Sequence, residues 1–377
     1  MKKHKGLKIA LIAVAAVLVV VLAAAWSMFG TQLTAANTIQ KLDEGLWSME
    51  YRGDYGFDKF LAQGGAASDA EMGDYIAAFL SHGFWKPDTS TAGGDYGCSA
   101  LMVNSPEGGM LFGRNYDWGD CKAMVVCTVP RNGYASVSTC CLDFLGFGED
   151  WVPDGSMADQ FMALAAVYVP LDGMNEKGLC VADLMVEPGE VVHQDTDKPD
   201  LTVTAALRML LDYTAEVDEA LAMLRHYDMN FSLESAHHFA ISDATGRSVV
   251  VEWIGGEMVV TETNVVTNHY VAQRDGLPEG FEASHLRFDT LAGLRESHDG
   301  VMTGDEVMDA MQAAASSNFN YLREDHENRR TQWTLVFDQD ALTARFCRLE
   351  DWDRPYLLDL MNDSWLQIGQ SPSELGR

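Results

Sequence analysis

Three residues whose side chains could form a reactive centre lie close together in the sequence. Cys98 comes just before the apolar run 100–103, and Arg114 and Asp117 belong to the run 110–118. A turn containing Pro and Gly separates the two runs, so the sequence predicts a β-hairpin. A thiol, a guanidinium and a carboxylate brought together by a hairpin could support nucleophilic chemistry.

The predicted hairpin places the arginine next to the thiol. If the turn is centred near Glu107, Cys98 lies opposite Tyr116, within the register error of a long turn, and on the same face as Arg114. A guanidinium favours the thiolate that a reactive cysteine requires. Asp117 would face away in a regular strand, but a strand end or a bulge would turn it back. Taken alone, the pattern fits a buried, inert cysteine near a surface arginine better.

A resemblance to a known family changes this interpretation. The stretch 97–118, GCSALMVNSPEGGMLFGRNYDW, resembles the start of the catalytic chain in the choloylglycine hydrolase family of linear amide C–N hydrolases. That family includes conjugated bile acid hydrolases, penicillin V acylases and, more distantly, acid ceramidase. Its cysteine is followed by Arg sixteen residues later and by Asp nineteen residues later, and Cys98, Arg114 and Asp117 keep both spacings. Three further stretches match in family order: GMNEKGLCVADL (173–184), VVTNHY (265–270) and, more loosely, SHLRF (284–288).

The resemblance implies an N-terminal-nucleophile hydrolase, an α+β protein with a four-layer αββα sandwich, whose catalytic domain is 98–377. The family's precursor is cut before the cysteine, so cleavage between Gly97 and Cys98 is expected. The new α-amine would titrate at about 7.7–8.0 and could act as a general base, which an internal peptide nitrogen cannot. The flexible stretch 89–95, TSTAGGD, precedes this junction and makes the cut sterically feasible.

The resemblance also implies a role for each matching residue. Cys98 would attack the amide carbonyl, Arg114 would hold the thiolate, and Asp117 would hydrogen-bond the α-ammonium. Asn268 would donate its side-chain amide to the tetrahedral oxyanion, where the loss of one donor costs about 10²–10³ in rate. Arg287 would complete the charge network around the nucleophile. No cofactor and no metal is expected.

One position departs from the family pattern. The family often has Asn just after the NEKGL strand, and Met185 stands at the matching position. Its backbone N–H could still be the second oxyanion donor, but any side-chain contact with substrate is lost. The expected substrate is a linear N-acyl amide such as a conjugated bile acid, penicillin V or an N-acyl amino acid. The sequence does not choose among these.

Three other functions remain open at this stage. An acyltransferase of the same fold would pass the acyl group to an amine in place of water. A membrane-tethered binding domain without activity would have no reason to keep all the matching residues. A Cys-His-Asn protease would use His269 or His326 as its base. The sequence around Cys98, however, predicts a strand where a papain-like enzyme has a helix.

The rest of the chain is predicted to contain hairpins and amphipathic helices. The predicted strands are 238–242, 247–253, 258–262, 331–338 and 341–349. The predicted helices are 203–214, 217–224, 285–294 and 303–314, the last with a capping box at Thr303 and Glu306. Consecutive hairpins followed by consecutive helices favour antiparallel sheets covered by helices, which is an α+β architecture.

The N-terminal residues predict a membrane segment. Four lysines among the first eight residues precede the uninterrupted apolar run 9–26, which is long enough to span a bilayer. We expect 1–30 to be a transmembrane anchor, or a signal segment if it is cleaved. The basic end would stay inside, so the catalytic domain would lie outside the cytoplasm. Residues 31–97 are expected to form a helical leader, with a capping box at Ser68 and Glu71, that is apolar enough to stay bound after cleavage.

The charge and the remaining polar residues exclude some partners. The formal net charge is −30, from 26 Lys and Arg against 56 Asp and Glu. Such a chain repels the phosphate backbone, so a nucleic-acid partner is not expected. The neighbours His237 and His238 fit an ordinary pair at a strand edge better than a metal site, because no third ligand has a suitable spacing. Seven cysteines are an odd number, so at least one thiol is left over if the others pair.

Overall fold

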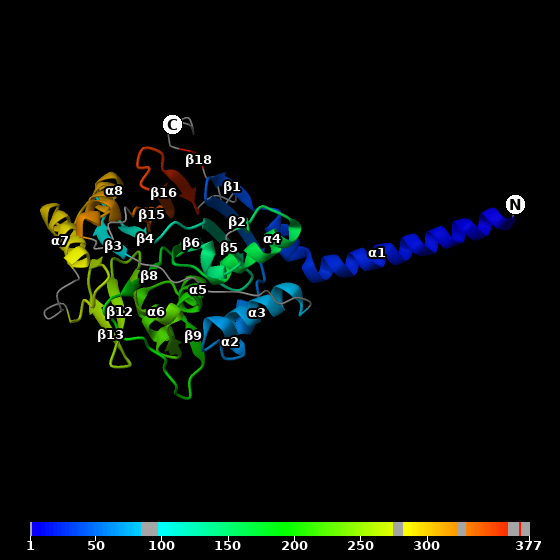
Figure 1. Ribbon diagram of the computed structural model, residues 1–377, viewed down its shortest axis with the longest axis horizontal. Helices are drawn as coiled ribbons and strands as arrows, with labels where there is room; N and C mark the ends of the chain where they lie inside the picture. Colours follow the sequence, from blue (N-terminus) through cyan, green and yellow to red (C-terminus); the bar gives the residue numbers. More distant parts are fainter. Residues whose placement is uncertain are drawn as a thin grey trace.

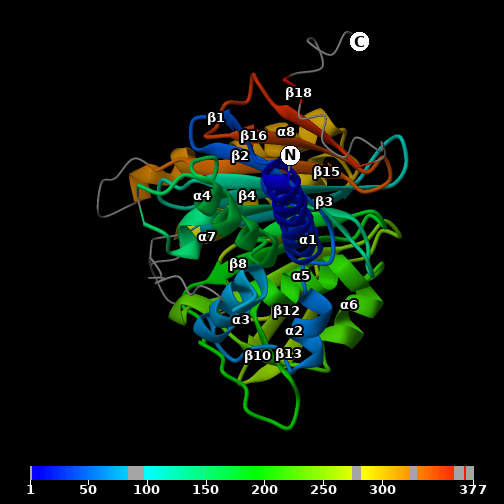
Figure 2. The same ribbon diagram turned by 90° about the vertical axis from the view of Figure 1, so that its right-hand side faces the viewer.

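Two β-sheets lie face to face between two layers of helices (Figures 1 and 2). The computed structural model describes residues 2–83, 97–148, 150–273, 282–322, 329–360 and 369–370. In this part of the chain the order of layers is helix, nine-stranded sheet, seven-stranded sheet, helix. The predicted α+β fold with an αββα sandwich is therefore confirmed.

The larger sheet has nine strands and is antiparallel except for one pair. Its order is β1 (Gln40–Asp43), β2 (Leu46–Gly53), β5 (Ala123–Pro130), β6 (Ser136–Cys141), β7 (Asp172–Asn175), β8 (Cys180–Val186), β11 (Ala236–Ser242), β12 (Ser248–Ile254) and β13 (Glu257–Glu262). Strands β2 and β5 run parallel and are paired along all eight residues of each.

The smaller sheet carries the predicted hairpin at its centre. Its order is β14 (Val265–Val266), β3 (Gly97–Asn104), β4 (Met110–Asp117), β15 (Thr331–Asp338), β16 (Thr343–Arg348), β17 (Tyr356–Asp359) and β18 (Gly369–Gln370). A separate parallel pair is formed by β9 (Asp200–Thr202) and β10 (Asp228–Asn230).

Helices cover the outer faces of both sheets. The nine-stranded sheet is covered by α2 (Phe57–Ala62), α3 (Asp69–Ser81), α5 (Val203–Tyr213) and α6 (Val217–Leu224), and the seven-stranded sheet by α7 (Glu282–Ser297) and α8 (Gly304–Ala313). The other helical elements are α1 (Lys2–Ala36), α4 (Met157–Ala163) and the short 3-10 turns η1 (Leu142–Leu145), η2 (Leu164–Tyr168), η3 (Ser232–Glu234) and η4 (Ser316–Leu322).

Three apolar cores hold the layers together. One lies between the nine-stranded sheet and its helices, one between the two sheets, and one between the seven-stranded sheet and α7 and α8. Cys140 belongs to the first core and Cys141 to the second, because adjacent residues of a strand point to opposite faces. Both are buried, free thiols. Cys98 belongs to the core between the sheets and is a free thiol.

Local sequence signals predicted most of the regular elements well. The helix 217–224 and the strand 331–338 have the predicted bounds. Ser68 and Thr303 cap the helices that follow them, and Thr303 forms a full capping box with Glu306. Strands β1, β2, β5 and β6 were not predicted. Because β1 and β2 lie within 31–97, the segment expected to be a helical leader also contains a strand pair.

The segment before Cys98 is built into the fold. Strand β2 extends the nine-stranded sheet, and the backbone of Ala66 donates to that of Asp200. The end of α1 is buried at Ala35 and Ala36, whereas the rest of this helix projects away from the body in Figure 1. From Leu11 to Ala36 the helix is long and apolar enough to cross a membrane, a test that a signal sequence also passes.

Candidate active site

Cys98 is the second residue of β3, and the register of the hairpin agrees with the prediction. Cys98 pairs with Tyr116 and Ala100 pairs with Arg114. Because side chains alternate along a strand, the thiol and the guanidinium share the face that points toward the other sheet. The Cys98 side chain is 3% exposed. It also lines a cavity, so the thiol is buried in the protein but borders the space that a ligand would fill.

Two side chains hold the backbone of Cys98 from both sides. Its N–H donates to Asn268 Oδ1 at 2.6 Å, and its carbonyl accepts from the guanidinium of Arg287 on α7. The same guanidinium donates to Asn268 Oδ1 at 2.8 Å and to Ser99 Oγ at 2.9 Å. Asn268 and Arg287 therefore meet at the peptide group of Cys98, although they come from a loop after β14 and from a helix.

Asp117 lies beside the peptide bond that joins Gly97 to Cys98. It is the last residue of β4 and pairs with Gly97. Its Oδ1 accepts from Thr331 Oγ1 at 2.6 Å, whereas Oδ2 is 3.6 Å from the guanidinium of Arg287 and has no hydrogen-bond partner among the described residues. Burial raises the pKa of the Asp117 carboxyl to about 6, although Arg287 acts in the opposite direction. A cation next to Asp117 Oδ2 would stabilise the carboxylate and so lower this pKa.

Arg114 joins the thiol to the other sheet. The guanidinium is fully buried and hydrogen-bonds the Cys98 side chain. It also donates to the carbonyl of Asp183 at 2.7 Å and lies 3.6 Å from a carboxylate oxygen of Asp172. Burial raises the pKa of the Cys98 thiol, and Arg114 offsets only part of this rise. In the uncut chain, burial therefore raises the pKa of the thiol by more than Arg114 lowers it.

Met185 and Asn268 are in contact across the two sheets. Met185 is the second-last residue of the matching strand β8, and its carbonyl accepts from Asn268 Nδ2 at 2.8 Å. An amide nitrogen carries two hydrogens, so this bond leaves one for a further acceptor. The N–H of Asn268 donates to Ser284 Oγ at 2.9 Å, which fixes the loop on α7. The residues of the three weaker motifs thus converge next to Cys98.

His269, one of the two histidines considered for the alternative protease, contacts α7. His269 Nδ1 is bonded to Ser284 Oγ at 2.9 Å, and its ring stacks on His285 of α7. It is not among the residues that line the cavity next to the thiol. His326 lies outside the described residues.

His237 and His238 lie near the start of a strand, as expected, but both are buried. They lie on β11, an interior strand of the nine-stranded sheet between β8 and β12. His237 Nδ1 is 2.9 Å from a carboxylate oxygen of Asp183, and His238 Nδ1 is 3.2 Å from one of Glu252. Each ring has one carboxylate partner, and the described residues contain no group of three possible metal ligands.

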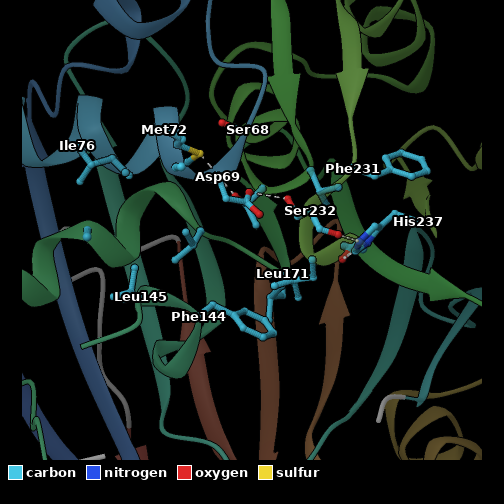
Figure 3. A pocket seen from close by; sticks show the side chains of 18 of the residues that line it. Ser68, Asp69, Met72, Ile76, Phe144, Leu145, Leu171, Phe231, Ser232 and His237 are labelled. Atoms are coloured by element: carbon cyan, nitrogen blue, oxygen red, sulfur yellow. Dashed lines mark hydrogen bonds and ion pairs between the residues drawn. The ribbon is translucent and has the colours of Figure 1, made fainter. Parts of the chain in front are cut away.

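A largely apolar cavity of about 470 Å³ opens next to Cys98 (Figure 3). The leader helix α3, the loop around Phe144, α4 and the turn before β11 all contribute walls. Its lining residues include Asp69, Met72, Ile76, Leu80, Cys98, Phe144, Phe161, Asp183, Met185, Ser232, Glu234 and His237. A cavity of this size can hold a drug-sized ligand, which makes it the candidate substrate site.

For several residues of the site, the sequence pattern gave little or no indication of a role. Thr331, Ser284 and Asp172 each hydrogen-bond or pair with a predicted residue, but single Ser, Thr and Asp residues are common on strands and helices. The loose match at 284–288 contains Ser284 and gave the only indication of it. The contact of Asp183 with His237 joins two strands that are far apart in the sequence.

The layers and the site together define a class of protein. An αββα sandwich with a cysteine at the start of a strand of the inner sheet, next to a cavity, is the architecture of the N-terminal-nucleophile hydrolases. Residues 98–271 match the family of linear amide C–N hydrolases known as the choloylglycine hydrolase family. This part of the chain, 46% of its length, is similar to that family.

Two curated relatives match part of the chain. A penicillin V acylase from Pectobacterium atrosepticum is 31% identical over 110 residues, which are 26% of this chain and 29% of that protein. A bile salt hydrolase/transferase from Clostridium perfringens is 30% identical over 177 residues, which are 45% of this chain and 51% of that protein. The chain therefore spans about half, or less, of the length of these curated relatives.

A solved structure has the same fold. The crystal structure of a variant of conjugated bile acid hydrolase from Clostridium perfringens superimposes with a TM-score of 0.53 and 18% sequence identity. The match covers 73% of this chain and 96% of the other. At this identity the similarity concerns the fold alone.

Proposed function

We propose that this protein hydrolyses a linear, non-peptide amide with Cys98 as an N-terminal nucleophile, which cleavage between Gly97 and Cys98 exposes. The observation that carries the proposal is the surroundings of the Cys98 nitrogen. Asn268 Oδ1 accepts from this nitrogen at 2.6 Å, and the buried Asp117 Oδ2 next to Gly97 has no hydrogen-bond donor in the part of the chain that the structure describes. A free α-ammonium at Cys98 would donate hydrogen bonds to both oxygens, so Asp117 Oδ2 would gain a donor.

The reaction follows from these groups. The α-amine of Cys98 takes the thiol proton, and the sulfur attacks the carbonyl carbon of the amide. The tetrahedral oxyanion accepts from the second hydrogen of Asn268 Nδ2 and from the N–H of Met185. When the C–N bond breaks, the α-ammonium returns its proton to the leaving amine. Water then adds to the thioester with the α-amine as base, and the acid is released.

The arginines would control charge during these steps. Arg114 hydrogen-bonds the sulfur, so it stabilises negative charge there once the proton has left. Arg287 holds the carbonyl of Cys98 and the oxygen of Asn268, so it fixes the angle between nucleophile and oxyanion donor. Both guanidinium groups are buried, which makes them more effective than solvated cations.

The similarity to this family supports a small N-acyl amide as substrate. The relatives named above are a penicillin V acylase and a bile salt hydrolase/transferase. A conjugated bile acid, penicillin V or an N-acyl amino acid is therefore a reasonable first substrate. The apolar side chains of Met72, Ile76 and Phe144 suit the acyl part of such an amide.

The leader would remain part of the mature enzyme. Strand β2 is paired with β5 along its whole length, and Tyr55 OH donates to the buried Asp212 at 2.6 Å. Cutting the chain before Cys98 leaves these contacts intact, so we propose that 31–97 stays bound. The exposed apolar helix that precedes it would anchor the protein in a membrane, with 98–377 outside the cytoplasm.

The intact mass of the purified protein tests the proposal. Under denaturing conditions, wild-type protein should separate into two chains, one that ends at Gly97 and one that begins at Cys98. The Cys98→Ala variant should stay uncut and folded, and Cys347→Ala, at a buried cysteine far from the cavity, should be cut normally. Turnover of an N-acyl amide panel should follow the cut. An unbroken wild-type chain without amidase activity would refute the proposal.

A further inference from the structure

We propose that Thr331 is a positioning residue for the reaction at Cys98. Its hydroxyl keeps Asp117 Oδ2 directed at the nitrogen of Cys98, where the cut would produce the α-amine that serves as base. Glu350, in the turn that follows β16, holds Thr331 in place. The inference rests on the proposed function, because it concerns the base of the same reaction, and it adds two residues that the family motifs do not contain.

The first observation is that the Thr331 hydroxyl has a fixed direction. It donates to Asp117 Oδ1 at 2.6 Å, and its oxygen accepts from the N–H of Ser316 at 3.0 Å. A hydroxyl carries one hydrogen and the N–H of Ser316 can only donate, so the hydrogen points to Asp117. Thr331 is fully buried, which keeps water from competing for this bond. The contact with Asp117 is therefore built into the fold.

The second observation is the orientation that this bond gives the Asp117 carboxyl. The group is planar, so a bond at Oδ1 also fixes the direction of Oδ2. A Cβ added to Gly97 would lie 3.0 Å from Oδ2, so this oxygen faces the junction at which the cut is proposed. The guanidinium of Arg287, 3.6 Å from Oδ2, is the competing partner. Without the hydroxyl, we expect Asp117 to turn both oxygens toward Arg287, the favoured geometry of such a pair.

The third observation is an irregularity of β15 at this point. Thr331 pairs with Asp117, whereas Trp333 pairs with Tyr116. Gln332 is therefore an extra residue, because in a regular ladder Thr331 would lie opposite the residue that follows Asp117. Bulges of this kind occur often next to active sites, where they redirect a side chain. Here the bulge brings Thr331 opposite the carboxylate that the proposed reaction uses.

The fourth observation is a strained turn that supports Thr331. Glu350 Oε1 accepts from the N–H of Thr331 at 2.8 Å and from that of Ser317 at 3.3 Å. Leu349 and Glu350 have φ angles of 52° and 60°. Residues other than glycine rarely adopt this left-handed conformation, and it persists where the surrounding structure requires it, often at functional sites. The turn returns the Glu350 side chain to the start of β15, where the hydroxyl of Thr331 meets Asp117.

The charges around the nitrogen of Cys98 set the consequence for pH. The charged groups that act on Asp117 or on the thiol of Cys98 are Arg114, Asp183, Arg287 and Glu350. The two guanidinium groups disfavour an α-ammonium at Cys98, whereas Asp117 Oδ2 favours it and so raises the pKa of the α-amine. Turning Asp117 toward Arg287 removes this contact and lowers that pKa. Because kcat/KM rises as the base loses its proton, the rising limb of the pH profile should then move to lower pH.

Thr331→Val, which keeps the shape and loses the hydroxyl, tests the inference. The cut should still take place, because Asn268 and Arg287 hold the Cys98 peptide independently of Thr331. With N-dodecanoylglycine as substrate, the rising limb of kcat/KM should move down by about half a pH unit or more, and its plateau should fall about tenfold. Thr331→Ser should restore both. Glu350→Ala should shift the limb less, and it gives the same comparison if Thr331→Val does not fold.

Thr334→Val is the matched control on the same strand. The buried Thr334 hydroxyl also donates to a side chain at 2.6 Å, but its partner is Asn115, which bonds to α8 on the other face of the sheet. This variant should lose a similar amount of stability and keep the pH limb of wild type. A limb that does not move in Thr331→Val, or that moves equally in the control, would overturn the inference.

A crystal structure of the uncut Cys98→Ala/Thr331→Val chain separates a failure of the inference from one of the proposed function. Both oxygens of Asp117 should lie on Arg287, and neither should face Gly97. This orientation, without a cut or turnover in the wild-type protein, would count against the proposed function alone. A carboxyl that keeps its wild-type orientation would overturn the inference.

Discussion

Two neighbouring residues of β11 have the same kind of partner but lie in different parts of the molecule. His237 pairs with Asp183 and His238 pairs with Glu252. Because consecutive side chains of a strand point to opposite faces, His237 borders the cavity and His238 lies in the interior. One pair can contact a ligand, whereas the other can act only through the protein.

The interior pair holds the loop that carries Asn268. His238 Nε2 is 2.8 Å from the carbonyl of Thr267. The two oxygens of Glu252 accept from the N–H groups of Val271 and Ala272 at 2.7 and 2.9 Å. The segment is therefore held at both ends of Asn268. Both pairs are buried, but only His237 and Asp183 border the cavity, whereas the interior pair holds the loop that carries the proposed oxyanion donor.

The largest expected effect comes from removing the interior carboxylate. Glu252→Ala leaves the fully buried imidazole of His238 without its carboxylate partner and removes the acceptor of two backbone N–H groups of the loop. The free energy of unfolding should fall by about 3–5 kcal/mol, as when one partner of a buried pair is removed. Urea denaturation measures this change. Glu262→Ala, on the exposed edge strand β13, is the matched control and should cost less than about 1 kcal/mol.

If Glu252→Ala cost no more than its control, the distinction between the two pairs would be wrong. In that case cleavage at Cys98 and turnover of all amides should also be unaffected. We expect both to fall, because Asn268 loses its fixed position. Asp183→Asn should also lower stability, because it leaves the buried ring of His237 without its carboxylate, but it should leave the position of Asn268 unchanged.

A buried carboxylate without a histidine partner sharpens the comparison. In the uncut Cys98→Ala chain, burial raises the pKa of Asp117 from its ordinary 3.8 to about 6. The folded state then binds the proton more tightly than the unfolded state, so stability is lost as pH rises between about 4 and 6. Relative to Cys98→Ala/Asp117→Asn, the Cys98→Ala chain should lose about 3 kcal/mol of unfolding free energy over this range.

Denaturant unfolding at pH 4, 5, 6 and 7 measures this difference. Asp117→Asn keeps the oxygen that Thr331 bonds, so its own stability should respond less to pH. A constant difference between the two chains would mean that Asp117 is already charged and paired before cleavage. The new α-ammonium would then add no stability through Asp117.

The cavity pair should respond to pH in a higher range. Burial lowers the pKa of His237, but the charge of Asp183 and its hydrogen bond outweigh this, so the pKa lies above its ordinary value. A raised histidine pKa adds stability that is complete below about pH 6.5 and is lost as pH rises through the folded value. The stability advantage of wild type over His237→Gln should therefore be larger at pH 5.5 than at pH 9.

The double variant His237→Gln/Asp183→Asn provides the control for this series. It has no charge to titrate at either position, so its stability should follow only the pH dependence of the rest of the chain. An advantage of wild type that grows with pH would contradict the raised pKa of His237. The comparison with the interior pair would then have to rest on burial alone.

The sequence predicted the parts of the site that depend on local spacing. The register of Cys98 and Arg114 followed from alternation within one hairpin, and the helix caps at Ser68 and Thr303 followed from short motifs. Asn268 and Arg287 could be proposed only through the family resemblance, because a loop and a helix bring them to Cys98 from distant positions. No local pattern specifies such a meeting.

The cavity pair could not be predicted, because it depends on pairing between strands. Asp183 on β8 meets His237 on β11 only through the cross-strand register, with 54 residues between them in the sequence. His237 and His238 alone look like an ordinary polar pair near a strand start. Strands β1 and β2 were missed although they form a hairpin around Gly45, and the parallel pairing of β2 with β5 again joins distant parts of the sequence. Long-range pairing therefore decides which polar groups border the cavity.

The smallest expected effect tests how the leader is joined to the cavity pair. Ser232→Ala removes the hydrogen bond to Asp69 but keeps the backbone carbonyl that faces His237. The free energy of unfolding should fall by about 1 kcal/mol, the usual net value of one hydrogen bond. Because this carbonyl stays in place, the pH dependence of stability that comes from His237 should remain. If Ser232→Ala removed this pH dependence, the hydroxyl of Ser232 and not its backbone carbonyl would hold the charged ring.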